Sequence, residues 1–597
     1  MICLRFVIYC QWIIPICMKK INSLLHLALA LVFFTACQKE KPVPEATPAQ
    51  PMPKPSAQAV AEWQHQKFSM FIHFGLFSLP GGVWKNERVT KGYSEQIRAH
   101  GKITKEEFHA LAKTFNPEKW NPDSVASLAK QAGMKSIVIT SKHHDGFAMF
   151  HTKFSDFNIV DATPYKHDVI KELAEACRKQ GLKFGVYFSL IDWDFPGAMP
   201  ISEHNSDSIP PKHHQLNLNQ VEELVTQYGP LSEIWFDMGK PTLQQSQELA
   251  AMVRKHQPDC LLSGRLWNDQ GDFAVMGDNA SPDFRMGTLW QTPASMFDET
   301  WGYRSWQVRG DAKEKAKEKL TSLIKVVSAG GNYLLNIGPM GDGGIVPFER
   351  EVLLTMGSWF KQNGEAVYGT TASLLPEQTW GVLTSKPGKE YLFPLNGPVD
   401  GKLVLKGLQS KVTKAYRLSD KSKSLPVGQE HGEWKIDAGS LKSKALADVI
   451  ALEYEGDLQY TPSKTLAAAA DGSYALTSDD AVSYHSYSGH DYNSTKATRI
   501  KLEWFISQAP DGQYTLALQR LPTGQEATVK ITVNGEATEA VLKGFAAQDS
   551  AAHITTPLLH FTLTTKAITQ VEVTLADQSN PHKDLGLDGL VLRMKKD

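Results

Sequence analysis

The chain has 597 residues, of which 42% are hydrophobic and 21% are charged, and its formal net charge is −1. This length exceeds one ordinary hydrophobic core, so we expect two to four domains with an ordinary globular composition. The balanced charge argues against a nucleic-acid-binding protein, and the chain has no acidic run of the kind that marks a disordered tail.

Residues 1–37 are predicted to form a lipoprotein signal region, with the true start at Met18. Two lysines follow Met18, and the apolar run at 21–34 is shorter than a membrane span. This run leads through small residues to Cys37, as in a bacterial lipobox, so we expect Cys37 to carry the lipid. A transmembrane helix is the less favoured alternative, because the lysines split the apolar stretch. We therefore expect export, with a lipid anchor in the periplasm or at the outer membrane or cell surface.

The segment at 38–60 is rich in Pro, Ala, Lys and Gln, and this composition predicts an extended tether. Only two cysteines follow the leader, Cys177 and Cys260, and both lie in apolar surroundings. They predict buried thiols rather than a disulfide framework. No spacing of Cys and His resembles a zinc site.

From 61 to 370 short apolar runs alternate with amphipathic helices. The runs are nearly continuous, as in strands buried on both faces. The expected strands are 69–74, 135–140, 183–190, 233–237, 261–265 and 332–337, and the expected helices include 123–131, 168–180 and 311–328. Repeated strand–helix units over this length predict an α/β fold of the (β/α)8 barrel type. An open doubly wound sheet is the alternative, but no GxGxxG follows the first strand.

After residue 370 the helical patterns end and short alternating strands take their place. We expect one β-sandwich at 371–456 and a second at 457–597. The second sandwich is open to two interpretations, carbohydrate binding or packing against the barrel.

Polar residues gather at the carboxyl ends of the expected barrel strands, where barrel enzymes place their chemistry. One polar residue at a strand end is often only a helix cap. Several ends carry such residues here, which favours an active site. They are His73, Lys142, His143, His144, Asp145, Tyr187, Asp237, Arg265 and Asn336.

Six motifs give the chain a resemblance to the α-L-fucosidases of glycoside hydrolase family 29, over residues 61–456. The motifs are KFSMFIHFGLFS (67–78), TSKHHDGFAMFHTKFSDFN (140–158), FGVYFSLIDW (184–193), EIWFDMG (233–239), WGYR (301–304) and GGNYLLNIGPMGDG (330–343). The resemblance implies a retaining exo-glycosidase that removes terminal α-L-fucose from oligosaccharides or glycoconjugates through a covalent fucosyl-enzyme. It also implies that no metal or organic cofactor takes part.

The resemblance places the nucleophile on Asp237 and sugar-hydroxyl ligands on His73, His143 and His144. A neutral imidazole donates from one nitrogen and accepts at the other, which suits a hydroxyl. Adjacent residues of a strand point to opposite faces, so His143 and His144 share a site only if the chain has left the strand there. Zinc binding by the three imidazoles is a weaker alternative.

Further ligands follow from the same resemblance. Glu95 stands where the family has a substrate-binding Glu, although Gln96 replaces the aromatic residue that usually follows. Tyr187 offers a hydroxyl, and Trp235 shares the strand face of the nucleophile and is expected to contact the apolar side of the sugar. Arg265 resembles a family Arg whose charge helps to keep the nucleophile ionised.

The resemblance places the acid/base residue on a loop that varies within the family, here 268–284. Asp278 is the best match by position, and Glu299 is its rival. Asp272, or no residue at all, is the remaining option. Gln291 stands where many relatives have Glu, and an amide cannot transfer a proton.

Two other functions remain open at this stage. One is a glycosidase of the same fold that acts on a related 6-deoxy or galacto-configured sugar. The other is a lipoprotein that binds glycans in the same pocket without turnover. The fucosyl linkage is expected to depend on the loops at 79–104 and 194–216, and the sequence leaves both linkage and oligomeric state undetermined.

Overall fold

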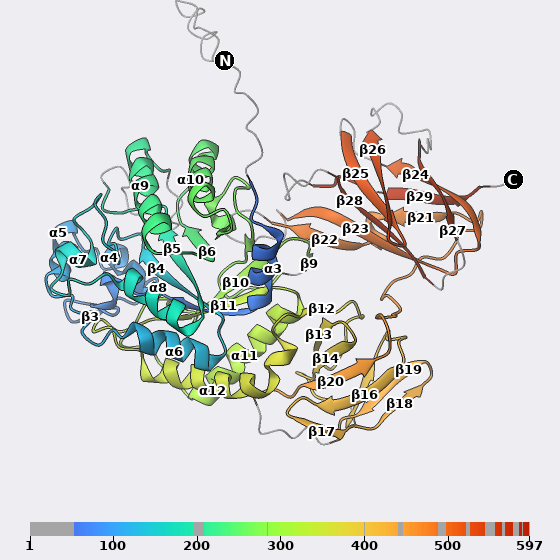
Figure 1. Ribbon diagram of the computed structural model, residues 1–597, viewed down its shortest axis with the longest axis horizontal. Helices are drawn as coiled ribbons and strands as arrows, with labels where there is room; N and C mark the ends of the chain where they lie inside the picture. Colours follow the sequence, from blue (N-terminus) through green and yellow to red (C-terminus); the bar gives the residue numbers. More distant parts are fainter. Residues whose placement is uncertain are drawn as a thin grey trace, which may run out of the picture. The chain divides into compact units, whose positions relative to one another are not determined.

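The computed structural model describes residues 53–597, apart from 196–207, 283, 399, 440–445, 488–496, 521–525, 544–555, 564–567, 577–583, 588 and 596–597 (Figure 1). The chain divides into two units, 1–52 and 53–597, and everything below concerns the second. The predicted signal region and its Cys37 lie outside the described residues. The predicted tether extends too far, because helix α3 (Ala57–Gln66) begins before residue 60, capped by the side chain of Ser56.

Eight parallel strands form the sheet of the barrel, in the order β7–β6–β5–β4–β1–β11–β10–β8. A parallel bridge between Ser263 and Phe273 connects the two ends of this order, so the sheet closes on itself. The strands are β1 (Phe68–Ile72), β4 (Ser136–Lys142), β5 (Lys183–Ser189), β6 (Glu233–Asp237), β7 (Leu261–Leu262), β8 (Ala274–Val275), β10 (Trp290–Ala294) and β11 (Asn332–Ile337). The barrel predicted from the sequence is confirmed.

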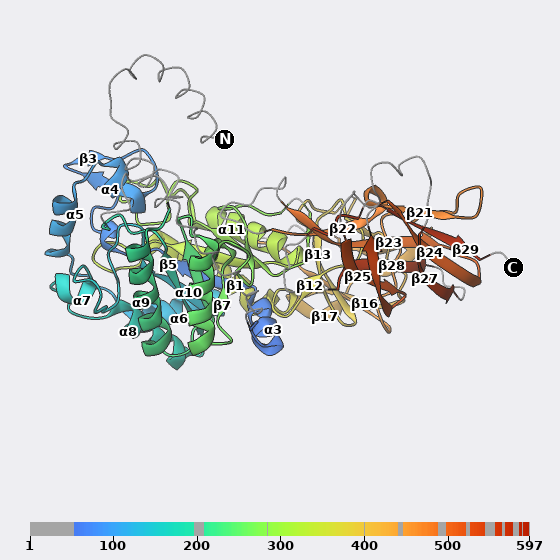
Figure 2. The same cartoon turned by 90° about the horizontal axis from the view of Figure 1, so that it is seen from above.

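Long helices flank the barrel strands (Figures 1 and 2). They are α6 (Pro122–Ala132), α8 (Val169–Gln180), α9 (Pro211–Gln227), α10 (Leu243–His256), α11 (Ala312–Ser328) and α12 (Pro347–Asn363). Local signals fix their ends: α8, for example, begins at the side-chain cap of Asp168 and ends at Gly181, whose φ of 71° a residue with a side chain rarely adopts. The helices predicted at 123–131, 168–180 and 311–328 are confirmed to within a residue at each end.

The barrel departs from a strict strand–helix repeat at two connections. Among the described residues, no α-helix lies between β7 and β8 or between β8 and β10. In the described part of these connections, the first contains the 3-10 turn η5 (Gly264–Leu266) and the second contains the short strand β9 (Arg285–Met286). Strands β8 and β10 escaped prediction because β8 has two residues and β10 contains polar residues and a proline.

The amino end of the barrel is filled by aromatic side chains. Trp63 of α3 stacks on Phe273, with ring centroids 4.5 Å apart. Its indole N–H donates to Oε2 of Glu233, at the start of β6, over 3.1 Å. These residues pack with Phe71 and Trp235 in one buried cluster. Because the amino end of the barrel is filled, the carboxyl ends of the strands are the place left for a site.

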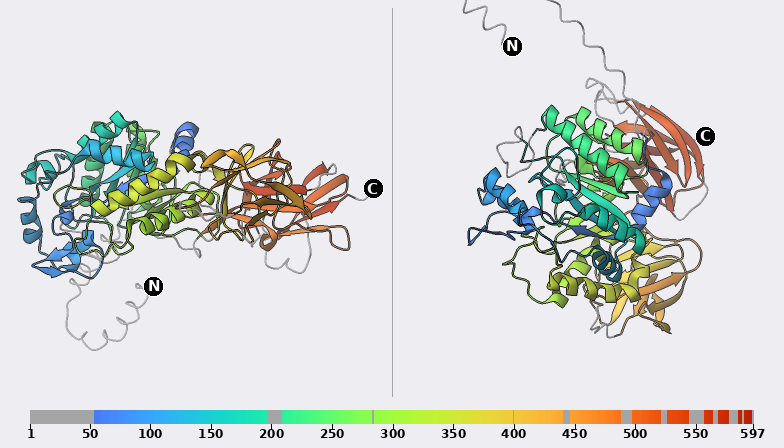
Figure 3. Two further views of the ribbon diagram at one scale, coloured as in Figure 1. Left: turned by 90° about the horizontal axis from the view of Figure 1, so that it is seen from below. Right: turned by 60° about the vertical axis from the view of Figure 1, so that its left-hand side comes forward.

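Two β-regions follow the barrel (Figure 3). The first has a six-stranded sheet, in the order β12–β13–β14–β20–β16–β17, and a three-stranded sheet, β15–β19–β18. Its strands are β12 (Thr371–Ala372), β13 (Val382–Lys386), β14 (Lys389–Phe393), β15 (Lys402–Leu405), β16 (Val412–Arg417), β17 (Asp420–Ser424), β18 (Val427–Glu430), β19 (Glu433–Asp437) and β20 (Ile450–Tyr454). Leucines of both sheets share one buried core.

The second β-region, here called the terminal sheets, also has two layers. One is β21–β29–β24–β27 and the other is β26–β25–β28–β23–β22–β9. Its own strands are β21 (Tyr474–Thr477), β22 (Val482–Ser486), β23 (Thr498–Ser507), β24 (Gly512–Arg520), β25 (Glu526–Val533), β26 (Glu536–Lys543), β27 (Thr556–Leu563), β28 (Ile568–Leu575) and β29 (Gly589–Met594). The predicted boundary between 456 and 457 stays a prediction.

Both cysteines beyond the leader, Cys177 and Cys260, are buried free thiols, as predicted. Within the part of 53–597 that the structure describes, no helix is long and apolar enough to cross a membrane.

Candidate active site

Asp237 is the last residue of β6, and its carboxylate is held at both oxygens. The phenol of Tyr187, on the neighbouring strand β5, donates to Oδ2 over 2.8 Å. Arg265 donates from Nη1 to Oδ1 over 2.9 Å. The residue is 4% exposed. Charge-assisted hydrogen bonds from two directions fix both the position and the orientation of this carboxylate.

Arg265 connects Asp237 to a second carboxylate. Its Nη2 donates to Oδ1 of Asp278 over 2.9 Å, while the guanidinium lies over the ring of Trp235 at 5.1 Å. Burial alone would lower the pKa of Arg265, but the two carboxylates raise it, so the cation persists. The sequence placed Arg265 on a strand, and this is wrong: it lies on the turn η5 that follows β7. The turn aims the guanidinium at both carboxylates.

Three imidazoles lie close together at the same end of the barrel. Strand β4 ends at Lys142, so His143 and His144 have left the strand, as a shared site requires. The ring centroids of His73 and His143 are 5.5 Å apart, and those of His143 and His144 are 4.1 Å apart. Burial lowers the pKa of His73 to about 4 and the pKa values of the other two well below the usual range. All three rings are therefore neutral at pH 7.

Hydrogen bonds assign the proton of two of these rings. Asn336 donates its amide N–H to the carbonyl oxygen of Trp301, so its Oδ1 accepts from Nδ1 of His73 over 2.7 Å. Nδ1 of His143 accepts from the backbone N–H of His144 over 2.8 Å. His73 therefore has a free lone pair on Nε2, and His143 carries its proton on Nε2. One ring accepts and the other donates, as recognition of sugar hydroxyls requires.

His144 is positioned differently. Its ring stacks on Trp193, with centroids 3.7 Å apart, and the backbone N–H of Trp193 donates to its carbonyl oxygen over 2.7 Å. Within the described residues, neither ring nitrogen of His144 has a hydrogen-bond partner. Its two nitrogens are the kind of unsatisfied buried groups that a bound ligand compensates.

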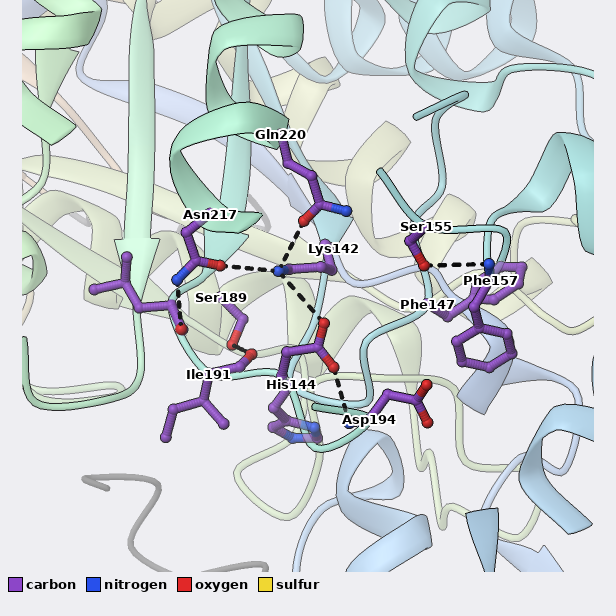
Figure 4. Close-up of polar contacts among 12 residues, drawn as sticks. Lys142, His144, Phe147, Ser155, Phe157, Ser189, Ile191, Asp194, Asn217 and Gln220 are labelled. Atoms are coloured by element: carbon purple, nitrogen blue, oxygen red, sulfur yellow. Dashed lines mark hydrogen bonds and ion pairs between the residues drawn. The ribbon is translucent and has the colours of Figure 1, made fainter. Parts of the chain in front are cut away.

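A buried ammonium group, that of Lys142, lies in the same region as His144 (Figure 4). Nζ of Lys142 donates to Oδ1 of Asn217 over 3.2 Å and to Oε1 of Gln220 over 3.0 Å, both on α9. Oδ2 of Asp192 lies 3.8 Å away. Burial lowers the pKa of Lys142 to about 8. This cation links the end of β4, helix α9 and the turn that carries Trp193.

Glu95 lies on the turn η3 (Ser94–Gln96) and is 2% exposed. Its Oε2 accepts the backbone N–H of Gly302 over 2.9 Å, and burial raises its pKa to about 7. The amide oxygen of Gln96 accepts from the backbone N–H of Tyr93 over 3.3 Å and lies 3.2 Å from Nε2 of His100.

Trp235 lies inside the barrel, two residues before Asp237 on β6 and 1% exposed. Its indole N–H donates to Oε1 of Gln291 over 2.7 Å, and Gln291 reaches Glu233 at 3.4 Å. Its contact with the apolar side of a sugar stays a prediction.

The rival acid/base candidates lie elsewhere. Glu299 is exposed and accepts from the amide of Gln307 over 3.3 Å. Asp272 lies before β8, where it accepts the backbone N–H of Leu262 over 2.7 Å and pairs with Arg254. Of the three carboxylates considered, Asp278 is the one bound to the guanidinium that also binds Asp237.

Two neighbours of the site, Tyr93 and Asn217, were not predicted from the sequence as functional. Tyr93 is half-buried against the barrel cluster, and burial, followed by the charges of Asp278 and Glu95, raises its pKa to about 12. Its place two residues before Glu95 was the available signal. Among the residues described, no group of three or more His, Cys, Asp or Glu is placed to hold a metal ion.

A closed parallel barrel with two carboxylates beside neutral imidazoles at its carboxyl end is compatible with the two-carboxylate chemistry of a glycoside hydrolase. The profile of the family described as Alpha-L-fucosidase matches residues 36–365. The chain belongs to this family.

Known relatives agree with this assignment. The plasma alpha-L-fucosidase of Rattus norvegicus is 32% identical over 376 residues, which are 58% of this chain and 79% of the relative. The crystal structure of alpha-L-fucosidase from Vibrio sp. strain EJY3 is 27% identical, with a TM-score of 0.65, and the match covers 91% of this chain and 98% of that one. A GH29 alpha-L-fucosidase from Bacteroides thetaiotaomicron, trapped as a covalent intermediate, is 25% identical with a TM-score of 0.61, covering 68% and 98%.

Proposed function

We propose that this protein hydrolyses terminal α-L-fucosides of oligosaccharides or glycoconjugates with retention of configuration. Asp237 is the nucleophile and Asp278 is the acid/base. The observation that carries the proposal is the shared cation: Arg265 binds one oxygen of each carboxylate, both at 2.9 Å. Two carboxyl groups held close together in this way are what a double-displacement glycosidase needs.

The roles follow from exposure and contacts. Asp237 is buried and held at both oxygens, so it is positioned to attack the anomeric carbon as the protonated Asp278 gives its proton to the leaving oxygen. The bond from the anomeric carbon to the leaving group breaks as the bond to Asp237 forms. Asp278, whose side chain is 30% exposed, then takes a proton from a water molecule. The oxygen of this water attacks the anomeric carbon as the bond to Asp237 breaks, which releases the sugar and restores both carboxyl groups.

Sugar recognition is assigned to the neutral groups around the pair. His73 offers a lone pair and His143 offers a proton, so together they bind hydroxyls of defined orientation. His144, with both nitrogens free of protein hydrogen bonds among the described residues, adds a third ligand. Glu95 completes the set as a buried carboxyl with a pKa of about 7.

Azide rescue tests the two roles separately. With an activated aryl fucoside, Asp278→Ala should regain turnover in azide and release the α-fucosyl azide, because the nucleophile is intact. Asp237→Gly should release the β-fucosyl azide by direct displacement. The same anomer from both variants, or full activity of Asp278→Ala without azide on a phenyl fucoside, would refute the assignment.

Two alternatives are tested with the unmodified protein. A panel of aryl glycosides compares α-L-fucoside with α-L-rhamnoside and the galactosides, and faster turnover of one of the latter would favour a related sugar as the substrate. Calorimetry with fucose, alongside a turnover assay, separates a working enzyme from a protein that binds glycans without hydrolysis.

We further propose that the chain is an exported lipoprotein anchored through Cys37. The support is the sequence alone: a positive start after Met18, a short apolar run and small residues before the cysteine. Labelled palmitate should be incorporated into the full-length chain in a bacterial host and should be absent from Cys37→Ala. Equal labelling of both chains would exclude the anchor.

A further inference from the structure

The loop that carries Asp278 contains a strand of the terminal sheets. Strand β9, on this loop between β8 and β10, is the edge strand of a six-stranded sheet and pairs in parallel with β22. The paired residues are Arg285 with Tyr484 and Met286 with His485. A loop of the barrel thus continues a sheet built from residues about 200 positions further along the chain.

Side-chain and backbone contacts extend this pairing beyond the two register partners. The backbone N–H of Gly287 donates to the carbonyl oxygen of His485 over 2.8 Å. The hydroxyls of Thr288 and Ser486 lie 3.3 Å apart. The rings of Phe284 and His485 have centroids 4.0 Å apart. The contact is therefore continuous along the returning arm of the loop.

Gly287 makes the close approach possible. A Cβ atom at this position would lie 2.8 Å from Cδ1 of Ile500 and 3.1 Å from Cβ of Tyr484. The first contact is with the far end of the flexible Ile500 side chain, which can turn away, whereas Cβ of Tyr484 on β22 must give by a few tenths of an ångström. A side chain larger than a methyl group needs still more room at this point, so the glycine favours the close approach of the two segments.

The outgoing arm of the same loop is held by the barrel. The backbone N–H of Asn279 donates to the carbonyl oxygen of Pro293 over 3.0 Å, and Oδ1 of Asn279 accepts from the N–H of Ser295 over 2.8 Å. Asp278 lies next to this anchor and accepts a hydrogen bond from Arg265. The loop is therefore fixed at one arm by β10 and at the other by β22, in place of a helix.

We propose that the terminal sheets act as a brace for the acid/base loop, residues 276–289, and thereby hold the Asp278 carboxyl in place for proton transfer. The inference rests on the proposed function, because it takes Asp278 as the acid/base. Ordering a connection without a helix costs conformational entropy, and the β9–β22 contact offsets this cost for the returning arm. Proton transfer depends on geometry, so a looser loop weakens the acid more than the nucleophile.

The test is a substitution at the point of closest approach, made in the full chain. Gly287→Val should separate β9 from β22. Gly428→Val is the matched control, since Gly428 is also a strand glycine and has open space around the position of a Cβ. Hydrogen–deuterium exchange of residues 276–289 should rise in the first variant and stay unchanged in the second.

Kinetics with aryl fucosides of different leaving groups provide the functional readout. General acid catalysis contributes about 10²–10⁴-fold, so a displaced acid should lower kcat/KM for phenyl fucoside by about tenfold. The dinitrophenyl fucoside, whose leaving group needs little protonation, should change by less than about twofold. A loss of the same size for both substrates would show general damage and would overturn the brace.

Asp278→Ala separates the inference from the proposed function. If Asp278→Ala shows no dependence on the leaving group, the acid/base assignment itself is wrong. If it shows this dependence and Gly287→Val does not, the brace is wrong and the proposed function stands. Should Gly287→Val not fold, His485→Ala removes the ring packing on Phe284 with little strain, and the same two readouts then decide.

Discussion

The phenol of Tyr187 donates a hydrogen bond to Oδ2 of Asp237 over 2.8 Å, from one barrel strand to the next. Strands β5 and β6 pair Ser189 with Asp237, so Tyr187 starts two residues nearer the amino end and points up toward the carboxylate. The burial of both side chains makes this a hydrogen bond to a charged group away from water.

Tyr187→Phe should therefore lower kcat/KM while leaving the fold intact. A hydrogen bond to a charged group contributes about 1.5–3 kcal/mol, which corresponds to a loss of about 10- to 100-fold. Tyr333→Phe is the matched control, because Tyr333 is equally buried in the barrel on β11. Steady-state kinetics check this, and equal losses in both variants would contradict a specific role for the Tyr187 hydroxyl.

Asp237→Asn should abolish the release of fucose from an aryl fucoside, because an amide is not a nucleophile at the anomeric carbon. The change is close to isosteric: the Asn oxygen can still accept from Arg265, while its NH2 group takes the place of the oxygen that faces Tyr187 and donates to the phenol oxygen instead. We expect an unchanged circular dichroism spectrum and retained binding of fucose. Turnover comparable to that of the unmodified enzyme would show that another residue attacks the sugar.

Lys142→Met should weaken sugar binding through His144. The ammonium is fully buried beside Asp192, which begins the turn that carries Trp193. Breaking a buried ion pair typically costs about 3–5 kcal/mol, because the remaining charge has no partner. We expect a lower melting temperature and a several-fold higher inhibition constant for fucose.

A second buried lysine separates the positioning effect from simple destabilisation. Lys67 is 1% exposed, and burial lowers its pKa to about 8 as well, but its Nζ donates to the carbonyl oxygen of Gly330, at the amino end of the barrel. Lys67→Met should lower the melting temperature without changing the inhibition constant. If both variants raise this constant equally, Lys142 has no special link to the sugar site.

The stability of the fold should fall in acid because His73 is buried as the neutral ring. Its folded pKa is about 4, and the unfolded pKa is 6.5. Below pH 6.5 the unfolded chain binds a proton that the folded chain does not, so stability is full above 6.5 and is lost as pH falls toward 4. The loss is about 3 kcal/mol for this ring at pH 4. The melting temperature should decrease less between pH 7 and pH 4.5 for His73→Gln than for the unmodified protein.

The ionisation of Glu95 should change the stability of the fold with pH in the opposite direction to that of His73. Burial raises its folded pKa to about 7 from 4.5, so the folded chain retains a proton that the unfolded chain releases. Stability therefore decreases as pH rises from 4.5 to 7, by about 3 kcal/mol. Glu95→Gln should lack this loss. In thermal unfolding experiments its stability relative to the unmodified protein should therefore be greater at pH 8 than at pH 5. An identical pH dependence in the variant and the unmodified protein would show that Glu95 ionises freely.

The sequence by itself determined the elements whose signals are local. Continuous apolar runs placed six of the eight barrel strands, and caps such as Asp168 and Gly181 placed helix ends, because burial and capping act within a few residues. Strand ends also placed Asp237 and the histidines at one rim, since parallel strands share a carboxyl edge.

Only the tertiary structure decided which groups meet. Arg265 binds both Asp237 and Asp278, and this depends on a turn that lacks any periodic signal. The protons of His73 and His143 depend on partners that no local pattern encodes. The pairing of Arg285 with Tyr484 joins residues far apart in the chain, and such contacts are set by how whole sheets pack rather than by the composition of either segment.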